Sequence, residues 1–111
     1  MRYYILDRLG DPIPEPDMDK WGIWMNSTDC HVAKNSIDGV YISTVFLGLD
    51  HSFSDGELPV LWETMIFANG QSWATHLDEY QQRYTSLADA KAGHKEAVGK
   101  LTQLRSEKDV N

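Results

Sequence analysis

Apolar, β-branched and aromatic residues are concentrated in two stretches near the middle of the chain. The stretches are VYISTVFLGL (40–49) and PVLWETMIFA (59–68), and their composition is typical of strands. The polar segment DHSFSDGE separates them, and a loop of this kind joins neighbouring antiparallel strands. The pattern therefore predicts a central β-hairpin.

Alternation of side chains defines the two faces of this hairpin. Successive residues of a strand point to opposite sides, and both sides carry large apolar groups. If the hairpin turns near Ser54, Thr44 is opposite Thr64 and Val45 is opposite Glu63. We expect a hairpin that is covered on both faces, or one that is covered on one face and has an apolar surface available for binding on the other.

The N-terminal part of the chain predicts a strand, a connection and a short helix. RYYIL (2–6) is typical of a strand, and the Pro- and Gly-rich segment DRLGDPIPEP interrupts it. A helix is expected after Asp17, which suits an N-cap position. CHVAKNS (30–36) is expected to be a strand or an extended passage. Helical spacing predicts that the buried face of the short helix consists of Met18, Trp21, Trp24 and Met25.

The C-terminal part predicts a loop at NGQSWATHLDE (69–79), a strand at YQQRYTS (80–86) and a long amphipathic helix. Ser86, followed three residues later by Asp89, resembles a capping box. Residues 106–111 are expected to form a flexible tail. The apolar face of the helix is predicted to consist of Leu87, Ala90, His94, Ala97, Val98, Leu101 and Leu104.

The order of these elements, without βαβ alternation, predicts an α+β fold. We expect an antiparallel β-sheet with a short N-terminal helix and a C-terminal helix packed on it. Residues 1–105 are expected to form a single domain, since 111 residues suffice for one modest core. No stretch approaches 18 apolar residues, so a membrane span is not expected. Cys30 is the only cysteine, so a cytoplasmic location is expected.

The net charge of −7 is concentrated before Thr85, and the remainder of the chain is nearly neutral. Binding to nucleic acid depends on contacts from Lys and Arg to phosphate, so an acidic body argues against DNA or RNA as a partner. The charge permits a basic protein partner or a cation. A homodimer is also left open, and no cofactor is indicated.

Asp50 and His51 directly follow the first strand of the hairpin. Asp and Ser side chains commonly accept hydrogen bonds from backbone amides in turns, which accounts for LDHSFSDG as turn chemistry. The alternative is that Asp50 orients His51 as a base, or that both bind a metal.

Glu63 lies on an apolar strand, where an unpaired carboxylate would be costly to bury. His94 is a lone imidazole in the apolar stripe of the last helix. Because such a helix usually packs on the sheet, Glu63 and His94 are candidates to meet. The simpler interpretation is a structural hydrogen bond. The alternative is a metal or acid–base site that combines Glu63, His94 and His51.

Aromatic residues supply the remaining candidates for binding. Trp73 is expected either to contact a partner or to fold back over the core, with His76 in the same loop. Tyr84 fits an edge strand or a contact surface. Thr44, which is predicted to lie opposite Thr64, is also a candidate binding residue.

Several motifs resemble a family of small uncharacterised proteins encoded by bacteriophages and prophages. These motifs are STVFLGLDH, LWETMIF and the opening YYILDRLGDPIPEPDMDKWGIWM, and the likeness covers roughly residues 3–98. The segment ANGQSWATHLDEY is longer than the corresponding linker of that family, so Trp73 and His76 are a local addition. The resemblance implies a phage-linked intracellular protein and supplies no catalytic residues.

The sequence therefore favours a non-enzymatic binding module that acts on a host or defence protein, or on a small signalling molecule. The first alternative is a small hydrolase or metal-dependent enzyme that uses Glu63, His51 and His94. The second alternative is a structural phage component.

Overall fold

The predicted hairpin lies at the centre of a four-stranded antiparallel sheet. The computed structural model describes residues 2–52 and 58–109. The sheet consists, in spatial order, of β3 (His31–Ile37), β4 (Val40–Phe46), β5 (Trp62–Phe67) and β6 (Gln81–Tyr84). The predicted α+β fold is therefore confirmed, and the passage at 30–36 is a strand.

The register of the central hairpin is the predicted one. Thr44 pairs with Thr64, and Val45 pairs with Glu63. The expected turn near Ser54 lies outside the described residues. Because strand residues alternate between faces, the register places Thr44 and Thr64 on one side of the sheet and Glu63 on the other.

Two short strands precede the sheet and form a separate pair. They are β1 (Tyr4–Leu6) and β2 (Pro12–Pro14). The sequence did not predict β2, since Pro removes a backbone donor and is confined to edge positions in sheets. In a pair of only two strands every position is at an edge, so two prolines are tolerated.

The short helix α1 (Met18–Ser27) begins as predicted. The carboxylate of Asp17 accepts hydrogen bonds from the amides of Asp19 and Lys20, at 2.9 and 3.2 Å. The indole N–H of Trp21 donates to the carbonyl of Gly48 at 3.0 Å and ties α1 to the main sheet. Met18 is 59% exposed, so its predicted burial is wrong. As the first helical residue, it lies at the surface beside the Tyr3 hydroxyl.

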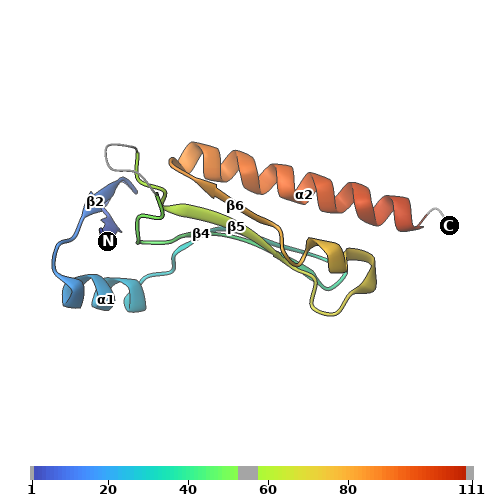
Figure 1. The fold of residues 1–111 in the computed structure, drawn as a ribbon, viewed down its shortest axis with the longest axis horizontal. Helices are drawn as coiled ribbons and strands as arrows, with labels where there is room; N and C mark the ends of the chain where they lie inside the picture. Colours follow the sequence, from blue (N-terminus) through green and yellow to red (C-terminus); the bar gives the residue numbers. More distant parts are fainter. Residues whose placement is uncertain (1, 53–57, 110–111) are drawn as a thin grey trace.

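The long helix α2 (Leu87–Asp109) covers one face of the sheet (Figure 1). The hydroxyl of Ser86 accepts a hydrogen bond from the amide of Asp89 at 3.0 Å, as the predicted cap requires. Residues 106–109, expected as part of a tail, continue the helix. The molecule is elongated, with extents of 54 × 29 × 23 Å. Among the described residues, no helix is long and apolar enough to cross a membrane.

The core under α2 is divided into two apolar clusters. The first contains Val40, Ile42, Ile66, Ala68, Ala74, Ala97 and Leu101, and it includes residues of the 3-10 helix η1 (Ser72–Leu77) within the expected loop. The second contains Tyr4, Phe46, Leu61, Trp62 and Ala90. Along β4, Thr44 lies between Ile42 and Phe46, so a polar layer separates the two clusters.

Candidate functional site

A chain of five hydrogen-bonded polar side chains runs between α2 and the sheet. The Tyr84 hydroxyl donates to Thr64 Oγ1 at 3.1 Å, and the two threonine Oγ1 atoms are 2.5 Å apart. Thr44 Oγ1 lies 2.7 Å from His94 Nδ1. The other ring nitrogen, Nε2, lies 2.7 Å from Asn35 Oδ1. The chain therefore joins β3, β4, β5 and β6 to α2 and forms the polar layer of the core.

In each hydrogen bond of this chain, the donor is the residue nearer to Tyr84 and the acceptor is the residue nearer to Asn35. The amide oxygen of Asn35 only accepts, so His94 Nε2 carries the proton. In the neutral imidazole, which burial favours, Nδ1 carries no proton and accepts from the Thr44 hydroxyl. Thr44 accepts in turn from Thr64, which accepts from Tyr84. This order requires a neutral imidazole.

Burial also favours the neutral form of His94. Its side chain is almost completely buried, and the two threonines are fully buried. Desolvation lowers the pKa of His94 below its ordinary value. An uncharged imidazole that is bonded at both ring nitrogens and only 4% exposed positions α2 on the sheet.

Glu63 and His94 do not meet. Glu63 lies on the opposite face of the sheet, where its Oε2 accepts hydrogen bonds from Arg83 Nε at 2.9 Å and from Gln81 Nε2 at 2.8 Å. His51 lies beyond the end of β4, and its amide bonds to the carbonyl of Val60. The structure therefore does not bring Glu63, His94 and His51 together as the enzyme hypothesis requires.

Asp50 has the role that turn chemistry predicts. Its Oδ1 accepts hydrogen bonds from the amides of Ser52 and Val60, at 2.8 and 3.0 Å. Desolvation acts to raise the pKa of Asp50, but the hydrogen bonds from Ser52 and Val60, together with the charge of Arg2, outweigh it and hold this pKa below its usual value. The bond from Ser52 is local to the turn, the bond from Val60 ties the two hairpin ends together, and neither involves the His51 ring.

Trp73 folds back over the core. It packs against the first apolar cluster from η1, and the guanidinium of Arg105 lies 5.0 Å from its ring centre. Arg105 Nε also donates to Asp38 Oδ2 at 2.7 Å, so the end of α2 is tied to the turn between β3 and β4. His76 is exposed on the same 3-10 helix.

The sheet face opposite α2 is the part of the structure best suited to a large partner. We call it the open face. Alternation along the strands assigns to it Lys34, Ser36, Tyr41, Ser43, Val45, Glu63, Met65, Phe67, Gln81 and Arg83. Tyr41 and Phe67 stack with ring centres 5.9 Å apart, and Phe67 is 39% exposed.

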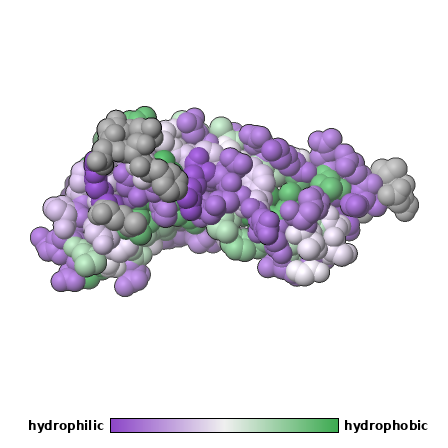
Figure 2. Space-filling model, viewed as in Figure 1, coloured by the Kyte–Doolittle hydropathy of each residue, from purple (hydrophilic) through white to green (hydrophobic). Residues whose placement is uncertain are grey.

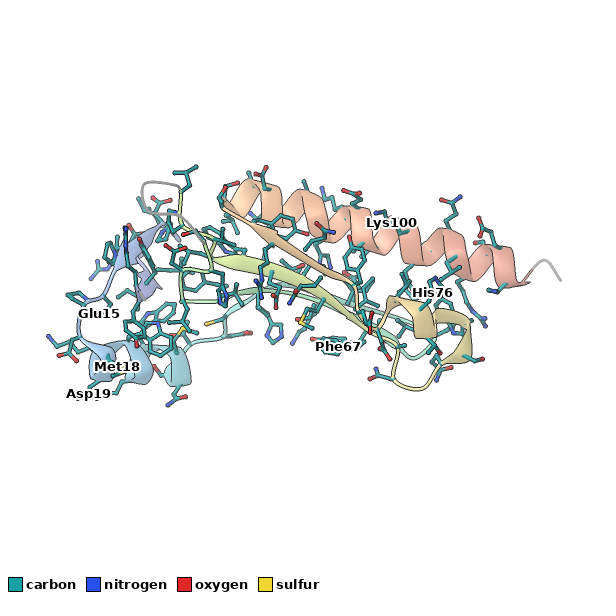
Figure 3. All side chains as sticks on the ribbon, in the orientation of Figure 1. Glu15, Met18, Asp19, Phe67, His76 and Lys100 are labelled. Atoms are coloured by element: carbon teal, nitrogen blue, oxygen red, sulfur yellow. The ribbon has the colours of Figure 1, made fainter. Side chains whose placement is uncertain are left out.

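The figures show how accessible this face is. Phe67 lies on the side of the sheet away from α2 (Figure 3). The lower outline in Figure 2 steps inward between the part formed by α1 and the part around η1, and apolar surface is visible there. The open face thus lies between two projecting parts of the molecule (Figure 2) and carries aromatic groups.

A small cavity that the sequence does not indicate lies beside Cys30 and His31. The cavity has a volume of about 200 Å³ and lies between β1, the start of β3 and the first turns of α2. Burial, with the nearby charge of Asp29, raises the pKa of the Cys30 thiol, so this cysteine is not an activated nucleophile. The cavity is formed by segments far apart in the chain, and no local motif marks it.

No protein-family model matches the chain, and no curated protein or solved structure shows significant similarity to it. Among residues 2–52 and 58–109, no group of three or more His, Cys, Asp or Glu side chains is placed to hold a metal ion.

Proposed function

We propose that the chain is a non-enzymatic binding module that contacts a protein partner through the open face. The observation that carries the proposal is the unequal covering of the sheet: α2 seals one face, whereas the other presents the Tyr41–Phe67 stack. Aromatic residues, Met and Arg are enriched in protein interfaces, and the open face combines all three types.

The polar groups of the open face suit an interface as well. Glu63 is only 8% exposed, and its charge is already compensated by Arg83 at 2.9 Å. A partner that covers this pair does not have to neutralise a buried charge, which is the usual penalty for burying an ionic group. The apolar residues beside the pair then contribute by losing contact with water.

The partner we propose is a host protein with an apolar contact surface. The charged residues of the open face are Lys34, Arg83 and Glu63, so this face does not share the acidity of the chain as a whole, and apolar contacts favour the association. The resemblance of STVFLGLDH and LWETMIF to phage-encoded proteins supports a setting inside an infected bacterial cell. The buried chain around His94 gives no support to the enzyme alternative, because it is closed beneath α2.

Site-specific photo-crosslinking in a bacterial extract tests the proposal. A photoreactive phenylalanine analogue is placed at position 67, and at the exposed position 95 on α2 as the control. We expect one discrete product from position 67 whose extra mass belongs to a different protein. Val45→Asp should abolish this product, and position 95 should give none. Crosslinking only to a second copy of the chain, or equally from both positions, contradicts the proposal.

A further inference from the structure

The cavity beside Cys30 has an apolar interior. Phe46 and Trp62, both almost fully buried, form part of its wall, together with Leu6 and Val32. A dry cavity of about 150 Å³ holds a benzene molecule, so a cavity of this size accommodates a single ring with a short substituent. The site lies on the α2 side of the sheet and is separate from the open face.

The rim of the cavity carries charged groups of both signs, a carboxylate at Asp29 and an ammonium at Lys91. Asp29 and His31 are tied to each other, with Asp29 Oδ1 2.9 Å from His31 Nδ1 and 3.0 Å from the His31 amide. Lys91, from the second turn of α2, also lines the cavity. It forms no ion pair with any residue that the structure describes. The nearby N-terminus of α2 adds to the positive potential.

The wall also contains a hydrogen-bond donor without an acceptor. Trp62 Nε1 is buried and has no partner among the described residues. A buried N–H group that lacks an acceptor is unfavourable, and such groups are rare in folded proteins. The atom is buried, so the indole must move before an occupant of the cavity can accept from it.

We propose that this cavity binds a small molecule with one apolar ring and one anionic group. The ring contacts Phe46 and Trp62, and the anionic group lies beside the ammonium of Lys91. An oxygen of the ligand provides the acceptor that the Trp62 indole lacks. The interaction is non-covalent. It does not depend on the protein partner proposed above, because the two sites occupy opposite faces of the sheet.

Nuclear magnetic resonance with benzoate as the probe tests this inference. The Trp62 indole N–H signal, assigned by its loss in Trp62→Phe, reports on the cavity directly. We expect benzoate to shift this signal saturably with a dissociation constant of about 1 mM, a typical value for so small a ligand. Neutral benzamide should bind about threefold more weakly, as expected when an exposed charge is lost.

Two variants of α2 separate a contact with Lys91 from a general effect of charge. Lys91→Met should weaken benzoate binding about threefold. Lys108→Met makes the same change in net charge near the far end of the helix, about 25 Å away, and should leave binding unchanged. Equal binding to wild type and Lys91→Met contradicts the inference, as does the absence of saturation at about 5 mM benzoate.

Discussion

The ring of Tyr84 lies directly against the backbone of α2 at Gly93. A methyl group added to Gly93 would overlap the hydroxyl and the adjacent ring carbons of Tyr84. Gly93 is buried in the middle of a helix, where glycine is otherwise unfavourable. Its presence therefore allows α2 to approach the sheet closely enough for His94 to reach Thr44.

Gly93→Ala should lower the free energy of unfolding by about 1–3 kcal/mol, the usual cost of overpacking a core. The Tyr84 ring cannot move aside without losing the hydrogen bond from its hydroxyl to Thr64. Gly99→Ala is the matched control, because open space surrounds that position. It should raise stability by up to about 1 kcal/mol through helix propensity. Urea denaturation measures both, and similar effects of the two substitutions would contradict the close approach.

The free energy of unfolding should decrease as the pH falls, because His94 is buried in its neutral form. Its folded-state pKa lies below the ordinary value of 6.5, so the unfolded chain binds the proton more readily. The stability is fully present above pH 6.5 and is lost as the pH falls from there towards the folded-state pKa. The slope approaches about 1.4 kcal/mol per pH unit within this window.

Denaturation of the wild type and of His94→Gln between pH 7 and pH 5 measures this effect. The variant should be less stable at pH 7 and should show a flatter profile. Asp29 and Asp50 have lowered pKa values, so their contributions to stability are lost only at more acidic pH. Parallel pH profiles for the two proteins would rule out His94 as the source.

Removing one residue of the ion pair on the open face should lower the free energy of unfolding more than removing both. Arg83→Met leaves the Glu63 carboxylate almost buried with only Gln81 as a donor, and should cost about 1–3 kcal/mol. In Arg83→Met combined with Glu63→Leu, no unpaired charge remains, and much of the loss should be recovered. A double-mutant cycle from urea denaturation measures the coupling, and strictly additive effects would exclude it.

Neighbouring residues of β5 should respond differently to truncation. Ile66 is fully buried under α2, and Ile66→Ala should cost about 2–5 kcal/mol. Phe67 is 39% exposed on the open face, and Phe67→Ala should cost about 1 kcal/mol or less while weakening the proposed partner contact. Thermal unfolding and crosslinking together separate the two effects. Equal losses of stability would mean that the face of Phe67 is not open.

The hairpin register was predictable from the sequence, whereas the role of Glu63 was not fully so. Alternation alone places the side chains of Glu63 and Thr64 on opposite faces of the sheet. It does not say which face of the sheet α2 covers. Because α2 covers the face that carries Thr64, His94 is separated from Glu63. The pairing of Thr44 with Thr64 was predicted, but the contact of Thr44 with His94 joins residues 50 positions apart.

Other features depend on packing between segments that no local pattern connects. The strand β2 contains two prolines and pairs only with β1, so its composition indicates a connection and not a strand. The small cavity requires Leu6, His31 and Lys91 to come together from three elements. By contrast, the cap at Asp17 and the turn role of Asp50 were correctly predicted, because each depends on neighbours within ten residues.

The one-way order of the buried hydrogen bonds limits which substitutions the chain accepts. Each threonine hydroxyl has a single hydrogen, so Thr44 and Thr64 must each accept a hydrogen bond from one neighbour and donate one to the next. Valine at one of these positions leaves the neighbouring polar side chain without its hydrogen-bond partner, whereas serine keeps the hydroxyl and its hydrogen bonds. Related sequences should therefore change these positions in concert with His94, exchanging the whole layer for apolar residues or keeping all of it.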